Sequence, residues 1–197
     1  MSVRRIDGAA WGLPPDWVAW RLGMPEEAEA EARPLCADER TLAAVMAAVR
    51  RFEAIAAEEV PGTVASALWV PETSRRRPTA VAALRVLGPP SQGPRWDLEG
   101  TLQYARTSVH VPRGVRLLDV AALPSRVMAG EAVLQIVDTA PRFRRLLTRE
   151  WAWFILPPRT DRTVMVHVES SAVQHFDQIA EMTTAIANSV VVTLADR

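Results

Sequence analysis

The feature that most constrains the fold is a series of four apolar, β-rich runs in the second half of the chain. They read GVRLLDVAAL, GEAVLQIVD, LTREWAWFILPP and RTVMVHVES, and short polar or proline-bearing connections separate them. A parallel crossover needs about a dozen residues or more, so such short connections favour antiparallel neighbours. The sequence therefore predicts an antiparallel meander of four strands between residues 114 and 170.

Two long amphipathic helices are predicted on either side of this meander in the sequence. In ADERTLAAVMAAVRRFEAIAAEEVPG, apolar residues recur at spacings of three and four, Asp38 is a candidate N-cap, and Pro61 with Gly62 ends the helix. The second helix is predicted in SAVQHFDQIAEMTTAIANSV, where Ser171 and Gln174 have the spacing of a capping box. The runs GTVASALWV and PTAVAALRVLG predict a β-hairpin. The segment WDLEGTLQYARTSV predicts a shorter helix, and VVVTL predicts a last edge strand.

The third run of the meander indicates how the layers are arranged. In a strand, Trp151 and Trp153 point to one side and Phe154 to the other, so both faces of the sheet need covering. We therefore predict an α+β fold in which an antiparallel sheet is sandwiched between helices (α/β/α). It forms one domain over residues 1–197, with an irregular N-terminal arm and first strand over 1–37 and the sandwich core over 38–194. The two tryptophans are expected in the core, and a ligand-binding wall is the alternative.

Composition excludes some partners and compartments. The chain has 23 basic and 23 acidic residues, so no net charge directs it towards nucleic acid. No stretch approaches the roughly 20 apolar residues that span a bilayer, and MSVRRIDGAAWGLPPDW contains no apolar run of signal-peptide length. A single cysteine, Cys36, cannot form an internal disulfide. We expect a cytoplasmic protein without a membrane span.

Motifs for catalysis are missing, but one polar cluster remains. The sequence has no G-x-S-x-G, no Walker A motif and no glycine-rich dinucleotide loop, so we expect no cofactor and do not expect an enzyme. In VMVHVESSAVQHFDQ, however, His167 and Glu169 lie on a strand, and His175 and Asp177 open the following helix. Such groups can bind a divalent metal or form an acid–base pair. Their spacing matches no metalloenzyme motif, so a structural cluster is favoured, and a small metal-dependent or acid–base enzyme is the alternative.

Candidate partner-binding residues lie in the N-terminal arm and in one connection of the meander. Trp11 belongs to AAWGLPPDWVAWRLG, which has no helical period, and Arg142, Arg144 and Arg145 belong to PRFRRLL. Tryptophan is enriched in interface hot spots, and arginine binds carboxylates through two parallel hydrogen bonds. The alternatives are an arm that folds back over its own core and arginines that form a solvated loop tip. We expect another protein as the partner, and a homo-oligomer remains open.

The order of these elements resembles the PsbP-like family. The segment AVLQIVDTAPRFRRLLTREWAWFILPP, followed by RTVMVHVESSAVQHFDQIAEMTTAIANSV, is similar to uncharacterised actinobacterial members related to lipoproteins of the LpqN type, and PDWVAWRLGMPEEAEAEARPL resembles their opening strand and acidic connector. The chain departs from the lipoproteins because it has no lipobox cysteine near its start. The resemblance implies the sandwich fold and a non-catalytic protein-binding or accessory module, associated with a bacterial secretion or envelope assembly.

Overall fold

The computed structural model describes residues 4–59, 61–72, 75–88, 97–109, 111–143 and 146–195. Seven of its strands form one antiparallel sheet in the order β2-β3-β4-β8-β7-β6-β5, and β1 and β9 form a separate two-stranded ribbon. The strands are β1 (Ile6–Ala10), β2 (Trp17–Arg21), β3 (Thr63–Trp69), β4 (Ala80–Leu87), β5 (Val115–Val127), β6 (Gly130–Pro141), β7 (Thr148–Leu156), β8 (Thr163–Ser170) and β9 (Val191–Leu194). The predicted meander is thus confirmed as β5 to β8.

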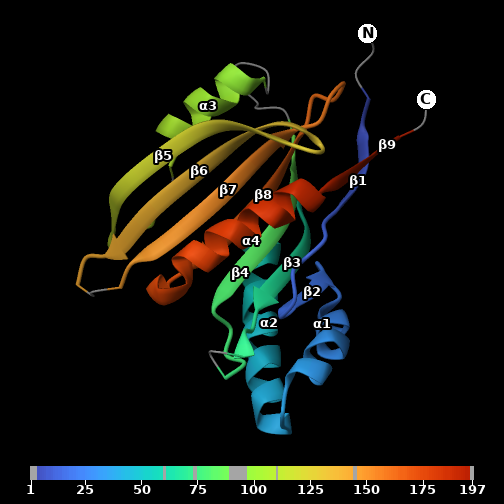
Figure 1. Cartoon of the computed structure of the whole chain (residues 1–197), viewed down its shortest axis with the longest axis vertical. Coiled ribbons are helices and arrows are strands. Elements are labelled where there is room, and N and C mark those ends of the chain that lie inside the picture. The colour runs from blue at the N-terminus through green and yellow to red at the C-terminus, as the bar shows by residue number, and fades with distance from the viewer. Residues whose placement is uncertain are drawn as a thin grey trace.

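The described helices lie on both faces of the large sheet (Figure 1). They are α1 (Pro25–Ala32), α2 (Glu39–Glu59), α3 (Leu98–Thr107) and α4 (Phe176–Ser189), with short 3-10 turns η1 (Arg33–Leu35) and η3 (Val173–His175). Helix α4 packs against β7 and β8 on one face, whereas α2 packs on β3 and α3 on β5 and β6 of the other. Helix α3 also covers Phe154 of β7 and Met165 of β8, whose side chains belong to the same apolar cluster as Ala105 of α3. In the described part of the chain, no helix has both the length and the apolar composition needed to cross a bilayer.

The first residues of α2 confirm the predicted N-cap. Asp38 precedes the helix, and its Oδ1 accepts a hydrogen bond of 2.7 Å from the backbone N–H of Thr41. After the helix, Gly62 has φ +80°, a left-handed conformation that favours glycine. A side chain at Gly62 would also meet the backbone carbonyl of Val86. Both signals therefore set the bounds of α2 as the sequence predicts.

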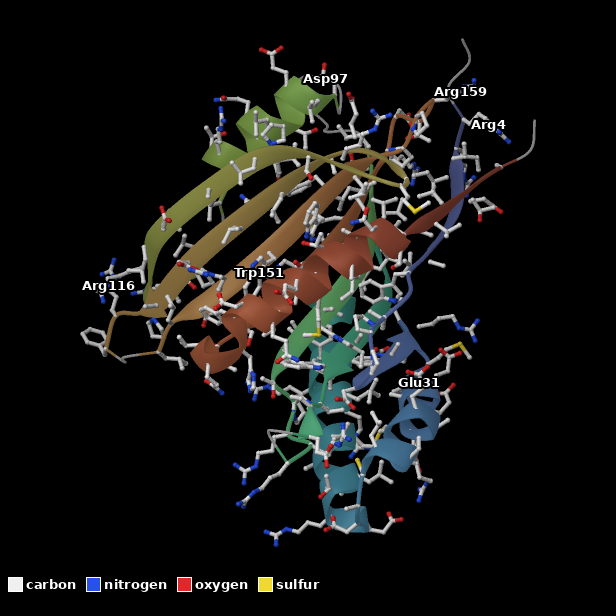
Figure 2. All side chains as sticks on the ribbon, in the orientation of Figure 1. Arg4, Glu31, Asp97, Arg116, Trp151 and Arg159 are labelled. Atoms are coloured by element: carbon white, nitrogen blue, oxygen red, sulfur yellow. The ribbon has the colours of Figure 1, made fainter. Side chains whose placement is uncertain are left out.

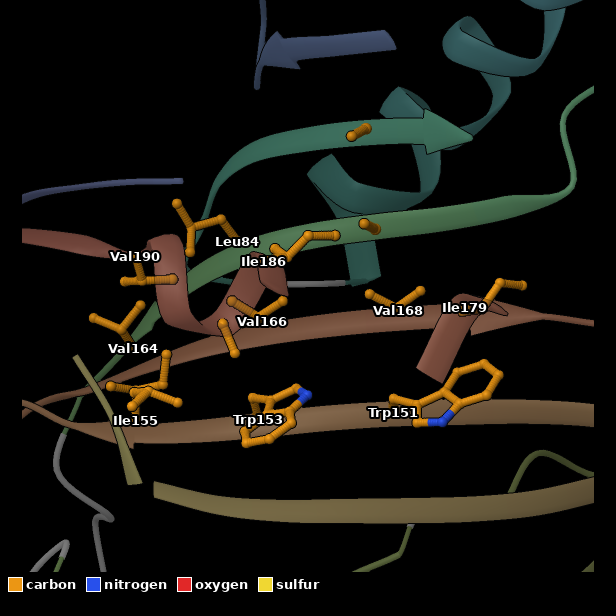
Figure 3. Packing of buried hydrophobic residues seen from close by; sticks show 14 of the residues in the cluster. Leu84, Trp151, Trp153, Ile155, Val164, Val166, Val168, Ile179, Ile186 and Val190 are labelled. Atoms are coloured by element: carbon orange, nitrogen blue, oxygen red, sulfur yellow. The ribbon is translucent and has the colours of Figure 1, made fainter. Parts of the chain in front are cut away.

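The tryptophans of β7 are core residues, as predicted. Trp151 is 1% exposed and Trp153 is 4% exposed. Figure 3 shows them beside Ile179 and Ile186 of α4, on the face of the sheet that α4 covers. The indole Nε1 of Trp153 donates to Thr183 Oγ1 of α4 at 3.3 Å, so this buried polar atom has a partner.

The prediction of an α+β fold, with the sheet sandwiched between helices, is wrong. The protein is mostly β, because 41% of the described residues lie in strands and 33% in helices. Strands are longer than the apolar runs indicate: β5 continues to Val127, past the predicted end at Leu123. The helices also leave part of the sheet uncovered, because Leu123, which lies on the α4 face, is 56% exposed.

The N-terminal segment is more regular than the sequence indicates. Residues 1–37 were expected to hold one strand in an irregular arm, but they contain β1, β2 and the helix α1. Strand β1 pairs with β9, so both ends of the described chain lie side by side (Figure 1). Strands β1 and β9 lie at opposite ends of the sequence, so their pairing leaves no local sequence signal. The sequence therefore does not predict β1.

Candidate functional site

The sheet divides the polar cluster that the sequence predicts. Side chains alternate along β8, and Val164, Val166 and Val168 point into the core beneath α4. His167 and Glu169 therefore point to the opposite face. His175 stays on the α4 side, where its ring lies 5.3 Å from that of Trp69, and Asp177 is exposed on α4. The four residues do not form one site.

A different acidic residue joins His167 and Glu169. Glu150 of β7 lies on their face of the sheet, and its Oε2 is 3.2 Å from His167 Nε2. Glu150 and Glu169 are also direct cross-strand partners, and we call them the glutamate pair. Within the part of the chain that the structure describes, no three His, Cys, Asp or Glu side chains are placed to hold a metal ion. The arrangement brings two carboxylates and an imidazole together without forming a metal centre.

The glutamate pair interrupts an apolar row that crosses all seven strands. The row follows the register of the sheet from β2 to β5: Val18, Leu68, Val81, Glu169, Glu150, Val137 and Val120. Like charges directly opposite each other on neighbouring strands destabilise a sheet. Two glutamates in the middle of a valine-rich row therefore cost stability, and this cost marks the position as a candidate site.

Burial and charge both act on Glu169. Burial, the larger effect, raises the pKa of the Glu169 carboxyl, and the negative charge of Glu150 raises it further, whereas His167 acts in the opposite direction. The carboxyl is thus easier to protonate than an ordinary glutamate. A cation beside Glu169 would offset the free-energy cost of keeping this carboxylate ionised next to Glu150.

A hollow of about 340 Å³ opens between α2 and the sheet, next to Glu169. We call it the α2 hollow. Its lining is Ala48, Arg51, Phe52 and Ile55 of α2, Pro78, and Leu68, Val81 and Glu169 of the sheet. The sheet residues belong to the row described above. Helix α2 therefore lies over Leu68 and Val81, and Glu169 is at the border of the hollow. Glu150 and this hollow were not predicted, because strand register cannot be read from the apolar pattern.

Two further hollows meet at Trp11. One, of about 780 Å³, is lined by β1, β2, β3 and α1, and the other, of about 480 Å³, by the segment 11–17 and residues near η1. Both are lined by Trp11, Ala19 and Glu31, and together we call them the Trp11 groove. Trp11 is half-buried and packs against the main core, so the arm folds back over its own domain. The exposed side of the Trp11 ring nevertheless lines the groove.

Helix α1 closes the edge of the sheet along this groove. Glu31 Oε2 accepts a hydrogen bond of 2.6 Å from the backbone N–H of Ala19, and Glu27 Oε2 accepts one of 2.9 Å from Arg21. Glu27 Oε1 also accepts from Arg21 Nε at 2.8 Å. These contacts lower the pKa of Glu27, first through the side-chain hydrogen bond from Arg21. Two outward N–H groups of the edge strand β2 are therefore occupied by carboxylates.

The described part of the arginine connection, which contains Arg142, lies far from Trp11. Arg142 is exposed, and Arg144 and Arg145 lie outside the described residues. Arg116 pairs with Ala140, shortly before Arg142, and Figure 2 shows Arg116 and the groove residue Glu31 on opposite sides of the molecule. The structure therefore does not bring Trp11 and Arg142 together. The neighbouring Phe143 is 96% exposed. In the sequence it is an aromatic residue among arginines, and this pattern alone does not predict its exposure.

Comparison with protein-family models and with curated protein sequences finds no match. The resemblance to the PsbP-like family therefore stays a prediction, and any function has to be argued from the surfaces described above.

Proposed function

We propose that the protein is a protein-binding module that holds an extended segment of a partner in the Trp11 groove. The observation that carries this proposal is that one half-buried tryptophan lines two open hollows, of about 780 and 480 Å³. Small side chains such as Ala19 and Ala30 leave the groove open, and Trp11, Leu13 and Pro14 supply apolar walls. Rigid aromatic and apolar anchors of this kind carry most of the energy in protein interfaces.

The charges around the groove indicate the chemistry of the partner. Asp7, Glu27 and Glu31 line the larger hollow, and Arg21, which also lines it, forms an ion pair with Glu27. The remaining negative potential favours arginine or lysine on the partner. Because α1 already occupies outward N–H groups of β2, the partner is held by its side chains and does not extend the sheet. The proposed ligand is an extended, basic and apolar peptide segment.

The alternative enzyme has less support. It required His167, Glu169, His175 and Asp177 to act together, and the sheet separates the first two from the last two. We also propose that the partner belongs to a bacterial secretion or envelope assembly, and this part of the proposal is supported by the family resemblance alone. The Trp11 groove itself is consistent with any partner that carries a basic, apolar segment.

Selection from a random peptide library displayed on phage tests the proposal. Peptides that the protein enriches should be rich in arginine or lysine and in aromatic or large aliphatic residues. The same selection on Ala30→Arg should lose them, because Ala30 is exposed on α1 and its replacement fills the larger hollow with a positive charge. Enrichment of acidic peptides, or equal enrichment by the variant, contradicts the proposal.

A further inference from the structure

The α2 hollow combines apolar walls with a carboxylate that accepts no hydrogen bond from any residue that the structure describes. Within the described residues, Glu150 contacts His167, but the Glu169 carboxylate accepts no hydrogen bond and forms no ion pair. Glu169 is half-buried, and the apolar side chains of Leu68 and Val81 line the same hollow. A partly buried carboxylate without a donor is costly, because its lost hydration is not replaced.

We propose that the α2 hollow binds a small organic cation, a monoamine with an apolar body, whose ammonium group pairs with Glu169. An ammonium group supplies charge-assisted hydrogen bonds, which are the strongest that a carboxylate can accept. The apolar body of the ligand lies against Phe52, Ile55 and Leu68. This site is separate from the Trp11 groove and does not depend on the proposed function.

The size and the charges of the hollow narrow the ligand further. Its volume of about 340 Å³ is near the lower end of the range for small-molecule sites, roughly 300–1,000 Å³, so the ligand is compact. Arg51 of α2 also lines the hollow, and its positive charge disfavours a second ammonium group on the ligand. Glu150 and His167 lie beyond Glu169 on the sheet, and Glu150 adds to the attraction for a cation. A monoamine therefore fits better than a diamine.

Calorimetric titration with 2-phenylethylamine at neutral pH tests the inference. We expect saturable binding of one molecule, with 2-phenylethanol and 3-phenylpropanoate binding at least about tenfold more weakly, because the alcohol lacks the charge and the carboxylate has the wrong one. The variant Glu169→Gln, which keeps the shape of the side chain, should reduce the amine to the affinity of the alcohol. Glu181→Gln, at an exposed position of α4, is the matched control and should bind as the wild type does.

A second variant allows the inference to be tested even if Glu169→Gln does not fold. Ile55 lines the hollow but is 38% exposed, so Ile55→Arg places a positive charge at the site with little loss of core packing. It should also abolish amine binding, and amide chemical shifts of Leu68 and Val81 should move on titration of the wild type only. No saturable binding of the amine, unchanged binding by the folded variants, or preference for the carboxylate would overturn the inference.

Discussion

Glu150 and Glu169 lie directly opposite each other on the antiparallel strands β7 and β8, on the face of the sheet opposite to α4. Every other residue of their cross-strand row is valine or leucine. Glu150 is in contact with His167, and Glu169 has an apolar hollow on its other side. A sheet that needed stability alone would have apolar residues at both positions, and this difference underlies the first prediction.

Glu169→Gln should stabilise the protein at neutral pH by about 0.2–1 kcal/mol, the usual size of a cross-strand pair energy, because it removes a like-charge pair. The pKa of Glu169 is raised by burial, so folding is penalised where this carboxyl is ionised. Below the ordinary pKa of glutamate both folded and unfolded states are protonated, and the penalty vanishes. The advantage of the variant should therefore be small near pH 4 and grow as the pH rises through the raised pKa.

Urea unfolding at several pH values measures this difference, with Glu181→Gln as a control that should show no such trend. A variant that is less stable than the wild type at neutral pH would show that the Glu169 carboxylate supports the fold.

Trp153→Ala should cost about 3–5 kcal/mol, the usual range for truncating a buried tryptophan. The ring is 4% exposed, and its Nε1 donates to Thr183. Trp153→Phe should cost less, because one aromatic ring is kept and the loss is limited to the pyrrole part of the indole and its hydrogen bond. Chemical denaturation of both variants gives the two free energies, and an equal loss for both would show that packing of the indole is not the main contribution.

Trp11→Ala should cost about 1–2 kcal/mol, a fraction of the full burial of a large apolar side chain. Trp11 is half-buried against the core, and the next residue, Gly12, donates its backbone N–H to Ser189 Oγ at 2.8 Å. Phe143→Ala makes a similar truncation at a 96% exposed ring and should change stability by no more than about 0.5 kcal/mol. Thermal unfolding compares the two, and equal effects would argue against the docked position of the arm.

Gly130→Ala should destabilise the protein by about 1–3 kcal/mol, as expected for a residue forced into an unfavourable backbone conformation. Gly130 follows the tight turn between β5 and β6, has φ +151°, and leaves no room for a side chain beside the carbonyl oxygen of Leu156. Gly8→Ala is the matched control, because nothing lies within 4 Å of the added atom. Similar stability of the two variants in denaturant would mean that the turn adapts.

Much of the element order could be predicted because it depends on local patterns. The apolar runs that contain Trp151 and Val166 marked strands, and Asp38 marked a helix start, since these signals lie within a few residues of one another. One local signal was misleading. Ser171 does not cap α4, because its Oγ bonds to Thr148 Oγ1 at 2.8 Å and the helix begins only at Phe176, after a 3-10 turn.

The candidate sites depend on contacts between distant segments, which the sequence does not encode locally. Alternation along β8 is enough to put His167 and Glu169 on one face of the sheet, but only the register of the strands brings Glu150 opposite Glu169. The position of His175 on the other face follows from the way α4 crosses the sheet, and not from its closeness in sequence. The Trp11 groove likewise requires α1, a segment that the sequence resemblance predicts to be a connector and not a helix.

The most direct test of the proposed function is the dissociation constant of a selected basic, apolar peptide for three forms of the protein. Ala30→Arg adds a positive side chain inside the Trp11 groove, and Ala44→Arg makes the same change at an exposed position of α2 outside it. Fluorescence polarisation of the labelled peptide should show at least about tenfold weaker binding to Ala30→Arg, a loss of about 1.4 kcal/mol or more, and unchanged binding to Ala44→Arg. Equal affinity for the wild type and Ala30→Arg would contradict binding in the groove.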